Sequence, residues 1–182
     1  MLSAQNHARY LAESPANLMT PKLFAEYAQS ILKQDDSLKL SIHEKSWIEE
    51  KGMNAFLSVA KGSTEAPYFL EIEYDGTQKT DSRPLALIGK GVTFDSGGIS
   101  IKPSSNMADM KGDMSGAAIV LSTMWAIQQL KLPIKVVTGI PLTENMPSGD
   151  ATRPSDVVKA MNGKTIEIGN TDAEGRMILA DA

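Results

Sequence analysis

Two short segments of the chain combine acidic, basic and glycine residues directly after apolar stretches. They span residues 89–103 and 170–176. Four acids of these segments and of the residues just after the first are candidate metal ligands, namely Asp95, Asp113, Asp172 and Glu174. Carboxylate oxygens can bridge two divalent cations and offset the repulsion between them, and such ions polarise a carbonyl group and lower the pKa of a shared water. The residue types therefore favour a carboxylate-rich metal site.

Three basic residues accompany these acids, namely Lys90, Lys102 and Arg176. A lysine binds a metal only as the neutral amine, because the ammonium group has no lone pair. A dication beside Lys90 would lower the pKa of that side chain far enough for it to act as a ligand. Oxygen ligands suit Mg²⁺ or Mn²⁺, and Zn²⁺ also accepts carboxylates.

Each of these residues also has a purely structural interpretation. Glu174 follows Thr171 by three residues, as in the capping box that begins a helix. Asp109 and Asp113 are four residues apart and could share the solvated face of a helix, and the glycines at 97–98 could form only a tight turn. Spacing alone leaves these interpretations open beside the metal site.

Gly89-Lys90-Gly91 invites comparison with a phosphate-binding loop, but the order of residues does not fit. A Walker A loop has Ser or Thr after its lysine, whereas Gly91 follows Lys90 here, and the dinucleotide pattern GxGxxG is absent. Nucleotide binding is therefore disfavoured.

The composition narrows the chemistry further. The 182 residues include no cysteine and only two histidines, His7 and His43, which are far apart in the sequence. This excludes zinc fingers, cysteine nucleophiles and HExxH metalloproteases. A net charge of −4 gives no electrostatic signature of nucleic-acid binding. No apolar run approaches the roughly 18 residues of a membrane span, and no secretory signal is evident, so a cytoplasmic protein is expected.

The hydrophobic pattern predicts which elements position the two segments. Helices are expected at 2–13, from Thr20-Pro21 onward, at 117–130 and from about 175. Apolar runs predict strands at 38–42, 69–74, 85–88, 134–140 and 165–168. Residues 85–88 are a continuous apolar run, which is typical of a strand buried on both faces. A strand, a helix and a strand in this order imply a parallel pair, and ligands of such sheets bind at the carboxyl ends of the strands.

The two polar segments resemble the signature regions of the leucyl aminopeptidase family. Residues 170–176 read as the family heptapeptide NTDAEGR, and residues 89–103 match its other signature, GKGVTFDSGGISIKP. Residues 14–17, 145–149 and 162–165 are also similar, so the resemblance spans nearly the whole chain. It implies an α/β fold with a mixed, largely parallel sheet flanked by helices in three layers. It also implies a helical linker at 1–35 and the amino-terminal part of the catalytic domain at 36–182, truncated at its end.

The resemblance implies a role for each site residue. The metal ligands would be Lys90, Asp95, Asp113, Asp172 and Glu174, and they would hold two divalent cations, Zn²⁺, Mn²⁺ or Mg²⁺, in each subunit. Asp95 and Glu174 would bridge the ions. Lys102 and Arg176 would be the catalytic cations, with a bicarbonate ion at Arg176 as general base. Met110 would line the substrate pocket.

The activity implied is the removal of amino-terminal residues, leucine and similar ones, from peptides or dipeptides. Family members are longer and form hexamers, so the chain is expected to be a part of such a protein. One alternative is a fragment or an assembly-only relative that binds metal or partner subunits without turnover. A two-metal phosphatase is disfavoured, because the histidines that such sites often use are missing.

Overall fold

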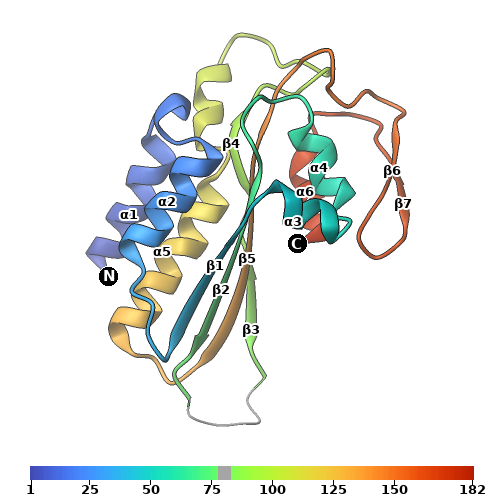
Figure 1. Cartoon of the computed structure of the whole chain (residues 1–182). Helices are drawn as coiled ribbons and strands as arrows, with labels where there is room; N and C mark the ends of the chain where they lie inside the picture. The colour runs from blue at the N-terminus through green and yellow to red at the C-terminus, as the bar shows by residue number, and fades with distance from the viewer. Residues whose placement is uncertain (78–82) are drawn as a thin grey trace.

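The protein is an α/β domain in which helices cover both faces of a mixed sheet (Figure 1). A computed structural model describes residues 1–77 and 83–182. Its helices are α1 (Leu2–Glu13), α2 (Pro21–Ile31), α3 (Lys45–Glu50), α4 (Asn54–Ala60), α5 (Ser115–Leu130) and α6 (Glu174–Asp181), with 3₁₀ turns η1 (Ala16–Leu18) and η2 (Met107–Gly112). Its strands are β1 (Leu38–His43), β2 (Tyr68–Asp75), β3 (Leu85–Ile88), β4 (Gly91–Asp95), β5 (Lys135–Asn145), β6 (Val157–Lys159) and β7 (Thr165–Glu167).

The main sheet has five strands with β5 near its centre. β1 pairs antiparallel with β2, and β2 pairs antiparallel with β5. β3 and β4 both pair parallel with β5, β3 along its first half and β4 along its last residues. Four strands therefore run in one direction and β2 in the other, which confirms the predicted mixed sheet and its parallel pair. The strand predicted at 165–168 is β7, which pairs with β6 in a separate two-stranded sheet.

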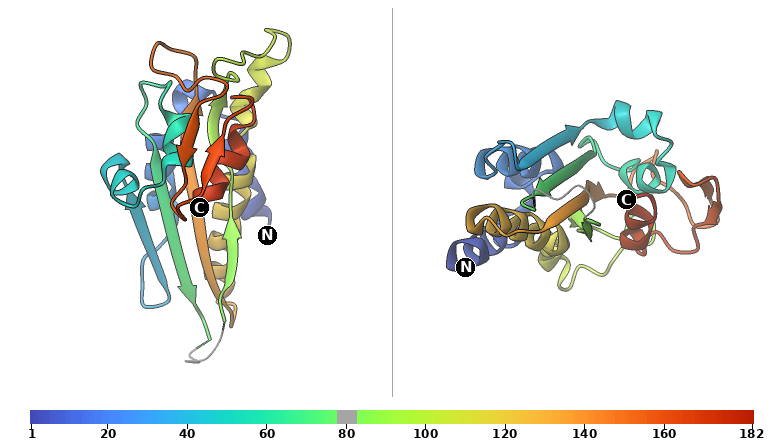
Figure 2. Two further views of the ribbon diagram at one scale, coloured as in Figure 1. Left: turned by 90° about the vertical axis from the view of Figure 1, so that its right-hand side faces the viewer. Right: turned by 90° about the horizontal axis from the view of Figure 1, so that it is seen from below.

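One face of the sheet is covered by α1, α2 and α5, as the two views of Figure 2 also show. The hydroxyl oxygen of Thr20 accepts a hydrogen bond from the backbone N–H of Leu23, and Pro21 occupies the first turn of α2, as predicted for this helix start. Leu11 of α1 and Phe24 of α2 are fully buried in the same core cluster as Leu70 of β2. The first 31 residues thus contribute to this core, while the division at residue 35 stays a prediction.

The opposite face of the sheet is covered by α3, α4 and α6. Ile48 and Phe56 pack there with Ile178 of α6 in a second core cluster. Successive strand residues point to opposite faces. Phe69 therefore belongs to this cluster, whereas its neighbour Leu70 belongs to the first. The sheet with its two helical layers forms the three-layer architecture implied by the resemblance. No helix within the two described ranges has the length and apolar content of a membrane span.

The expectation that residues 85–88 are buried on both faces is wrong. Within the described residues β3 pairs only with β5 and lies at the margin of the sheet (Figure 2), and Leu85 and Ile88 are 56% and 43% exposed. A continuous apolar run predicts a strand, but it does not distinguish a central strand from an edge strand.

A break between β3 and β4 places Lys90 beside the start of α5. The backbone N–H of Ala117 donates to the carbonyl oxygen of Lys90 at 2.9 Å. Gly89 permits this close approach to α5, because a Cβ there would meet Ala117 Cα at 2.8 Å. Gly91 lies equally close to β5, since a Cβ there would meet Pro141 O at 2.3 Å. The glycine–lysine–glycine sequence therefore forms the short connection from β3 to β4, and Lys90 carries the only side chain in it.

Replacing Leu11 tests whether α1 is an integral part of the domain. Leu11→Ala removes a fully buried side chain and should lower the free energy of unfolding by about 2–5 kcal/mol in one cooperative urea transition. Leu2→Ala is the matched control in the same helix. Because Leu2 is 78% exposed, that variant should stay within about 0.5 kcal/mol of the unchanged protein. Equal stability of the two variants would contradict the packing described here.

Candidate metal centre

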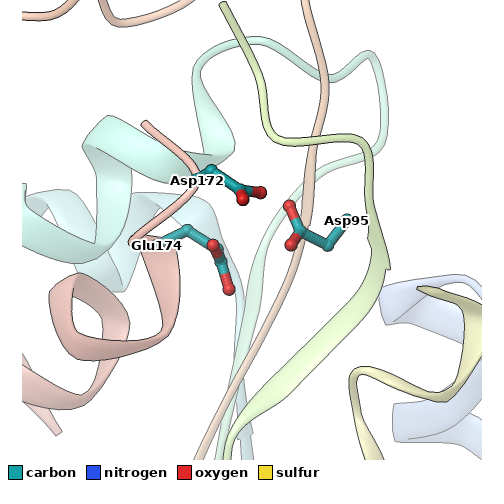
Figure 3. A group of neighbouring side chains, drawn as sticks. All are labelled: Asp95, Asp172 and Glu174. Atoms are coloured by element: carbon teal, nitrogen blue, oxygen red, sulfur yellow. The ribbon is translucent and has the colours of Figure 1, made fainter. Parts of the chain in front are cut away.

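The carboxyl end of β4 meets the loop that precedes α6, and the acidic residues of both segments converge there. Figure 3 shows the carboxylates of Asp95, Asp172 and Glu174 facing one another. One oxygen from each lies within 4.8 Å of the others. Asp95 and Glu174 are only 2% and 3% exposed, and Asp172 is half-buried. Three acids from segments more than 70 residues apart thus form one buried cluster.

Lys90 lies on one side of this cluster and links it to the fourth acid. Its ammonium nitrogen is 2.8 Å from Asp113 Oδ1 and 2.6 Å from Glu174 Oε1. Burial disfavours the charged amine, but the hydrogen bonds to the two carboxylates outweigh burial and hold the pKa of Lys90 above its ordinary value. A Cβ at Gly175 would lie 2.8 Å from Cε of Lys90, so glycine at this position leaves room for the lysine stem.

Lys102 lies on the other side. Its ammonium nitrogen is 2.8 Å from Asp95 Oδ2 and also pairs with Asp172 Oδ1. Hydrogen bonds to the two carboxylates exceed the opposing effect of burial and raise the pKa of Lys102 well above its ordinary range. Lys102 therefore stays positively charged at neutral pH.

Asp113, at the end of η2, titrates differently from an exposed acid. Burial, with a smaller effect of the negative charges of Glu174 and Asp95, raises the pKa of Asp113 to about 6, and the neighbouring Lys90 offsets only part of this rise. The centre thus concentrates more negative charge than its surroundings readily stabilise.

The donor set fits divalent cations. Oδ2 of Asp113 and Oε2 of Glu174 are buried and have no hydrogen-bond partner among residues 1–77 and 83–182. A buried carboxylate oxygen without a partner is costly, and a cation removes that cost. Hard oxygen donors beside one amine suit Mg²⁺, Mn²⁺ or Zn²⁺.

The loops that carry these acids have a specific backbone geometry. Gly97 and Gly98 adopt φ of +90° and +67°, a left-handed region that favours glycine. The Thr171 hydroxyl donates to Gly97 O at 2.7 Å and accepts from the backbone N–H of Ser100 at 2.8 Å. The predicted glycine turn is therefore confirmed, and its hydrogen bonds to Thr171 hold the two acidic segments together.

The structural alternatives for single residues are resolved by these contacts. Thr171 does not cap α6, whose N-cap is Ala173 without a side-chain hydrogen bond, so the capping-box interpretation is wrong. Asp109 and Asp113 do not share a helical face. Asp109 is exposed on η2, whereas Asp113 pairs with Lys90.

Two predicted site residues stand apart from the cluster of ion pairs. Arg176 is exposed in the first turn of α6 and forms no ion pair within the part of the chain that the structure describes. Met110 is half-buried on η2, and its place in a substrate pocket stays a prediction. His7 and His43 are hydrogen-bonded to Tyr27 and Glu71, outside the centre.

Asn145 also contributes to the centre, although it carries no charge and is not among the predicted site residues. It ends β5 directly beside Asp95, is 4% exposed, and donates hydrogen bonds from its amide nitrogen to Asp95 Oδ1 at 2.8 Å and to Thr171 O at 3.0 Å. An uncharged amide 50 residues from its partner gives no composition signal. The predicted strand ends at residue 140, whereas β5 extends to Asn145, so the one indication was that residues 145–149 resemble the family.

A buried centre of acids and lysines at the carboxyl end of a mixed α/β sheet is typical of a domain that binds metal ions. The cytosol aminopeptidase family, catalytic domain, matches residues 6–182. The chain belongs to this family.

Individual relatives support this family membership. The chain is 58% identical to the cytosol aminopeptidase of Mus musculus over 99% of its length, and 57% identical to that of Xenopus tropicalis over 98%. Among solved structures, the cytosol aminopeptidase of Coxiella burnetii superposes with a TM-score of 0.91 at 36% identity, covering 99% of this chain and 38% of that one. The bottromycin maturation enzyme BotP in complex with Mn has a TM-score of 0.90 at 41% identity, covering 98% and 38%. The chain spans about a third of the length of the curated relatives, 35% of the mouse protein and 34% of the Xenopus one.

Ion binding should depend on pH through Lys90 and Asp113. Because the raised pKa of Lys90 keeps it protonated at neutral pH, binding through its amine should release one proton, and affinity should rise about tenfold per pH unit above pH 6. Below pH 6 Asp113 must also lose a proton, so the dependence should steepen.

Calorimetry in buffers of different ionisation enthalpy counts these protons. Asp113→Asn should remove the steeper dependence of the affinity on pH below pH 6 and leave the release of one proton from Lys90. Binding without proton release at pH 7 would mean that Lys90 is displaced as an ammonium and is not a ligand.

Proposed function

We propose that the protein is a metal-dependent aminopeptidase that removes amino-terminal residues, leucine and similar ones, from peptides. The observation that carries the proposal is the buried centre in which two lysines, Lys90 and Lys102, pair with four converging carboxylates and leave carboxylate oxygens without a partner in the described residues. Family membership and the Mn-bound relative BotP support it.

Five side chains would hold two divalent cations. Lys90 and Asp113 would serve one ion, Asp172 the other, and Asp95 and Glu174 both. When bound, the ions would polarise the scissile carbonyl and lower the pKa of a shared water. The proximity of Asp95, Asp172 and Glu174 supports this assignment, because ions that share ligands must lie close together.

Lys102 and Arg176 would supply the positive charge that the reaction needs. Lys102 keeps its ammonium charged at the edge of the cluster, where it can donate a hydrogen bond to the oxyanion that develops on the substrate carbonyl. Arg176 is exposed in the turn after Glu174, so its guanidinium is available to an anion. Bicarbonate is the proposed anion, accepting and returning the proton as general base.

The remaining parts of the proposal concern the whole protein. Its substrates would be peptides or dipeptides with a free amino group, and Met110 would contact the side chain that is removed. A homohexamer in the cytoplasm is the assembly proposed, without nucleic-acid or membrane partners. The names of the curated relatives, cytosol aminopeptidases, support this setting.

Replacing Asp172 tests the metal site. The purified protein should bind about two Mn²⁺ per chain and release leucine from leucyl amide. Asp172→Asn should lose at least one ion and at least about 100-fold in kcat/KM, since an ion supplies several kcal/mol of transition-state stabilisation. Asp109→Asn, an exposed acid nearby, is the control and should match the unchanged protein. Ions bound without leucine release would support the non-catalytic alternative.

Replacing Lys102 separates charge stabilisation from ion binding. Lys102→Met should reduce kcat by about 10²–10³-fold, as for the loss of one oxyanion donor, with both ions retained. Metal analysis of the same sample measures the ions. An unchanged kcat would remove Lys102 from the reaction, and a loss of ions would show that it supports the ligands instead.

A further inference from the structure

We infer that Asn145 is a positioning residue that orients Asp95 towards the cations and fixes the distance between the two acidic segments. The inference rests on the proposed metal-dependent function and adds a residue that carries no charge. It starts from the place of Asn145 in the sheet, where Asp95 and Asn145 are register partners at the ends of β4 and β5.

The hydrogen bonds to Asp95 distinguish its two oxygens, because neutral donors occupy Oδ1 and a cationic partner faces Oδ2. Oδ1 accepts from the Asn145 amide at 2.8 Å and from the backbone N–H of Gly97 at 2.9 Å. Oδ2 faces Lys102 at 2.8 Å. Because two donors fix Oδ1, the carboxylate cannot rotate freely, and Oδ2 stays available for a positive partner.

The same amide group also holds the second acidic segment. It donates to Thr171 O at 3.0 Å, directly before Asp172. The carbonyl oxygen of Asn145 itself accepts from both the backbone N–H and the hydroxyl of Ser96, at 3.0 and 2.7 Å. Among residues 1–77 and 83–182, Asn145 is therefore the one residue from outside the two acidic segments that we find hydrogen-bonded to both of them.

The side chain of Asn145 packs closely against Gly98 on one side and borders a small cavity on another. A Cβ at Gly98 would lie 2.8 Å from its Oδ1, so the amide fits against a bare glycine. Next to it is a small cavity of about 20 Å³, which has room for about one water. This asymmetry allows two variants to separate positioning from packing.

Asn145→Leu keeps the shape of the side chain and removes both donors, whereas Asn145→Ala opens space in which water can donate in place of the amide. A positioning role predicts that Asn145→Leu weakens Co²⁺ binding by about 10–100-fold and shifts the visible Co²⁺ absorption, with Asn145→Ala between it and the unchanged protein. A packing role predicts the reverse order, because Ala leaves the larger void.

The experiment measures Co²⁺ affinity, Co²⁺ absorption, leucine release and thermal unfolding of the same samples. Thr138→Val is the matched control, since Thr138 is a buried residue of β5 whose hydroxyl bonds Ile72 O outside the centre. It should keep the affinity and the absorption unchanged. If Asn145→Leu fails to fold, Asn145→Ala must still bind Co²⁺ more weakly than the unchanged protein and shift its absorption.

The outcomes separate this inference from the proposed function. Variants with unchanged affinity and absorption, or affinities that only follow thermal stability, would overturn the role of Asn145 while the unchanged protein still binds ions and releases leucine. An unchanged protein that binds no ion would overturn both. Leucine release by the unchanged protein, together with weakened Co²⁺ binding by Asn145→Leu, supports both the proposed function and the role of Asn145.

Discussion

Buried carboxylates that lie within a few ångströms of one another need nearby positive charge, and the rest of this structure is arranged around that requirement. Two lysines supply part of this positive charge, and each of them is bonded to two acids. The balance is incomplete, since carboxylate oxygens of Asp113 and Glu174 remain without partners in the described residues. A centre with unmet affinity for cations is what a metal-binding hydrolase requires.

The backbone around the centre is shaped by the same requirement. Lys90 reaches the acids from a break between two strands, where bare glycines fit against α5 and β5. The left-handed turn at Gly97 and Gly98 brings the backbone of β4's following loop against Thr171, whose hydroxyl donates to Gly97 O. Glycine is used here where another backbone or a long side chain approaches too closely for a Cβ, and the mixed sheet supplies the fixed strand ends from which these loops start.

The charged residues of the centre could be predicted from the sequence because their types and their places after strands restrict what they can do. Lys90, Asp95, Asp113, Asp172 and Glu174 do converge, although their roles as ligands stay predictions. The burial of β3 could not be predicted, because the apolar run of Leu85–Ile88 is the same at the edge of a sheet as at its centre. Asn145 was missed for a different reason: an amide has no charge, and its importance depends on a register between strands that only the folded chain reveals. Helix starts such as Thr20-Pro21 were predictable, since capping is local.

The convergence of distant segments has a consequence for the order of events during synthesis. Asp95, Asn145 and Thr171 come from three successive stretches of the chain, and contacts with such large sequence separation form slowly, because closing the intervening chain costs conformational entropy. Before they form, the same acids are scattered over an open chain that offers no closed set of donors. The proposed ions would therefore bind only after β4, β5 and the segment before α6 have come together, so that metal loading would report the docking of α6.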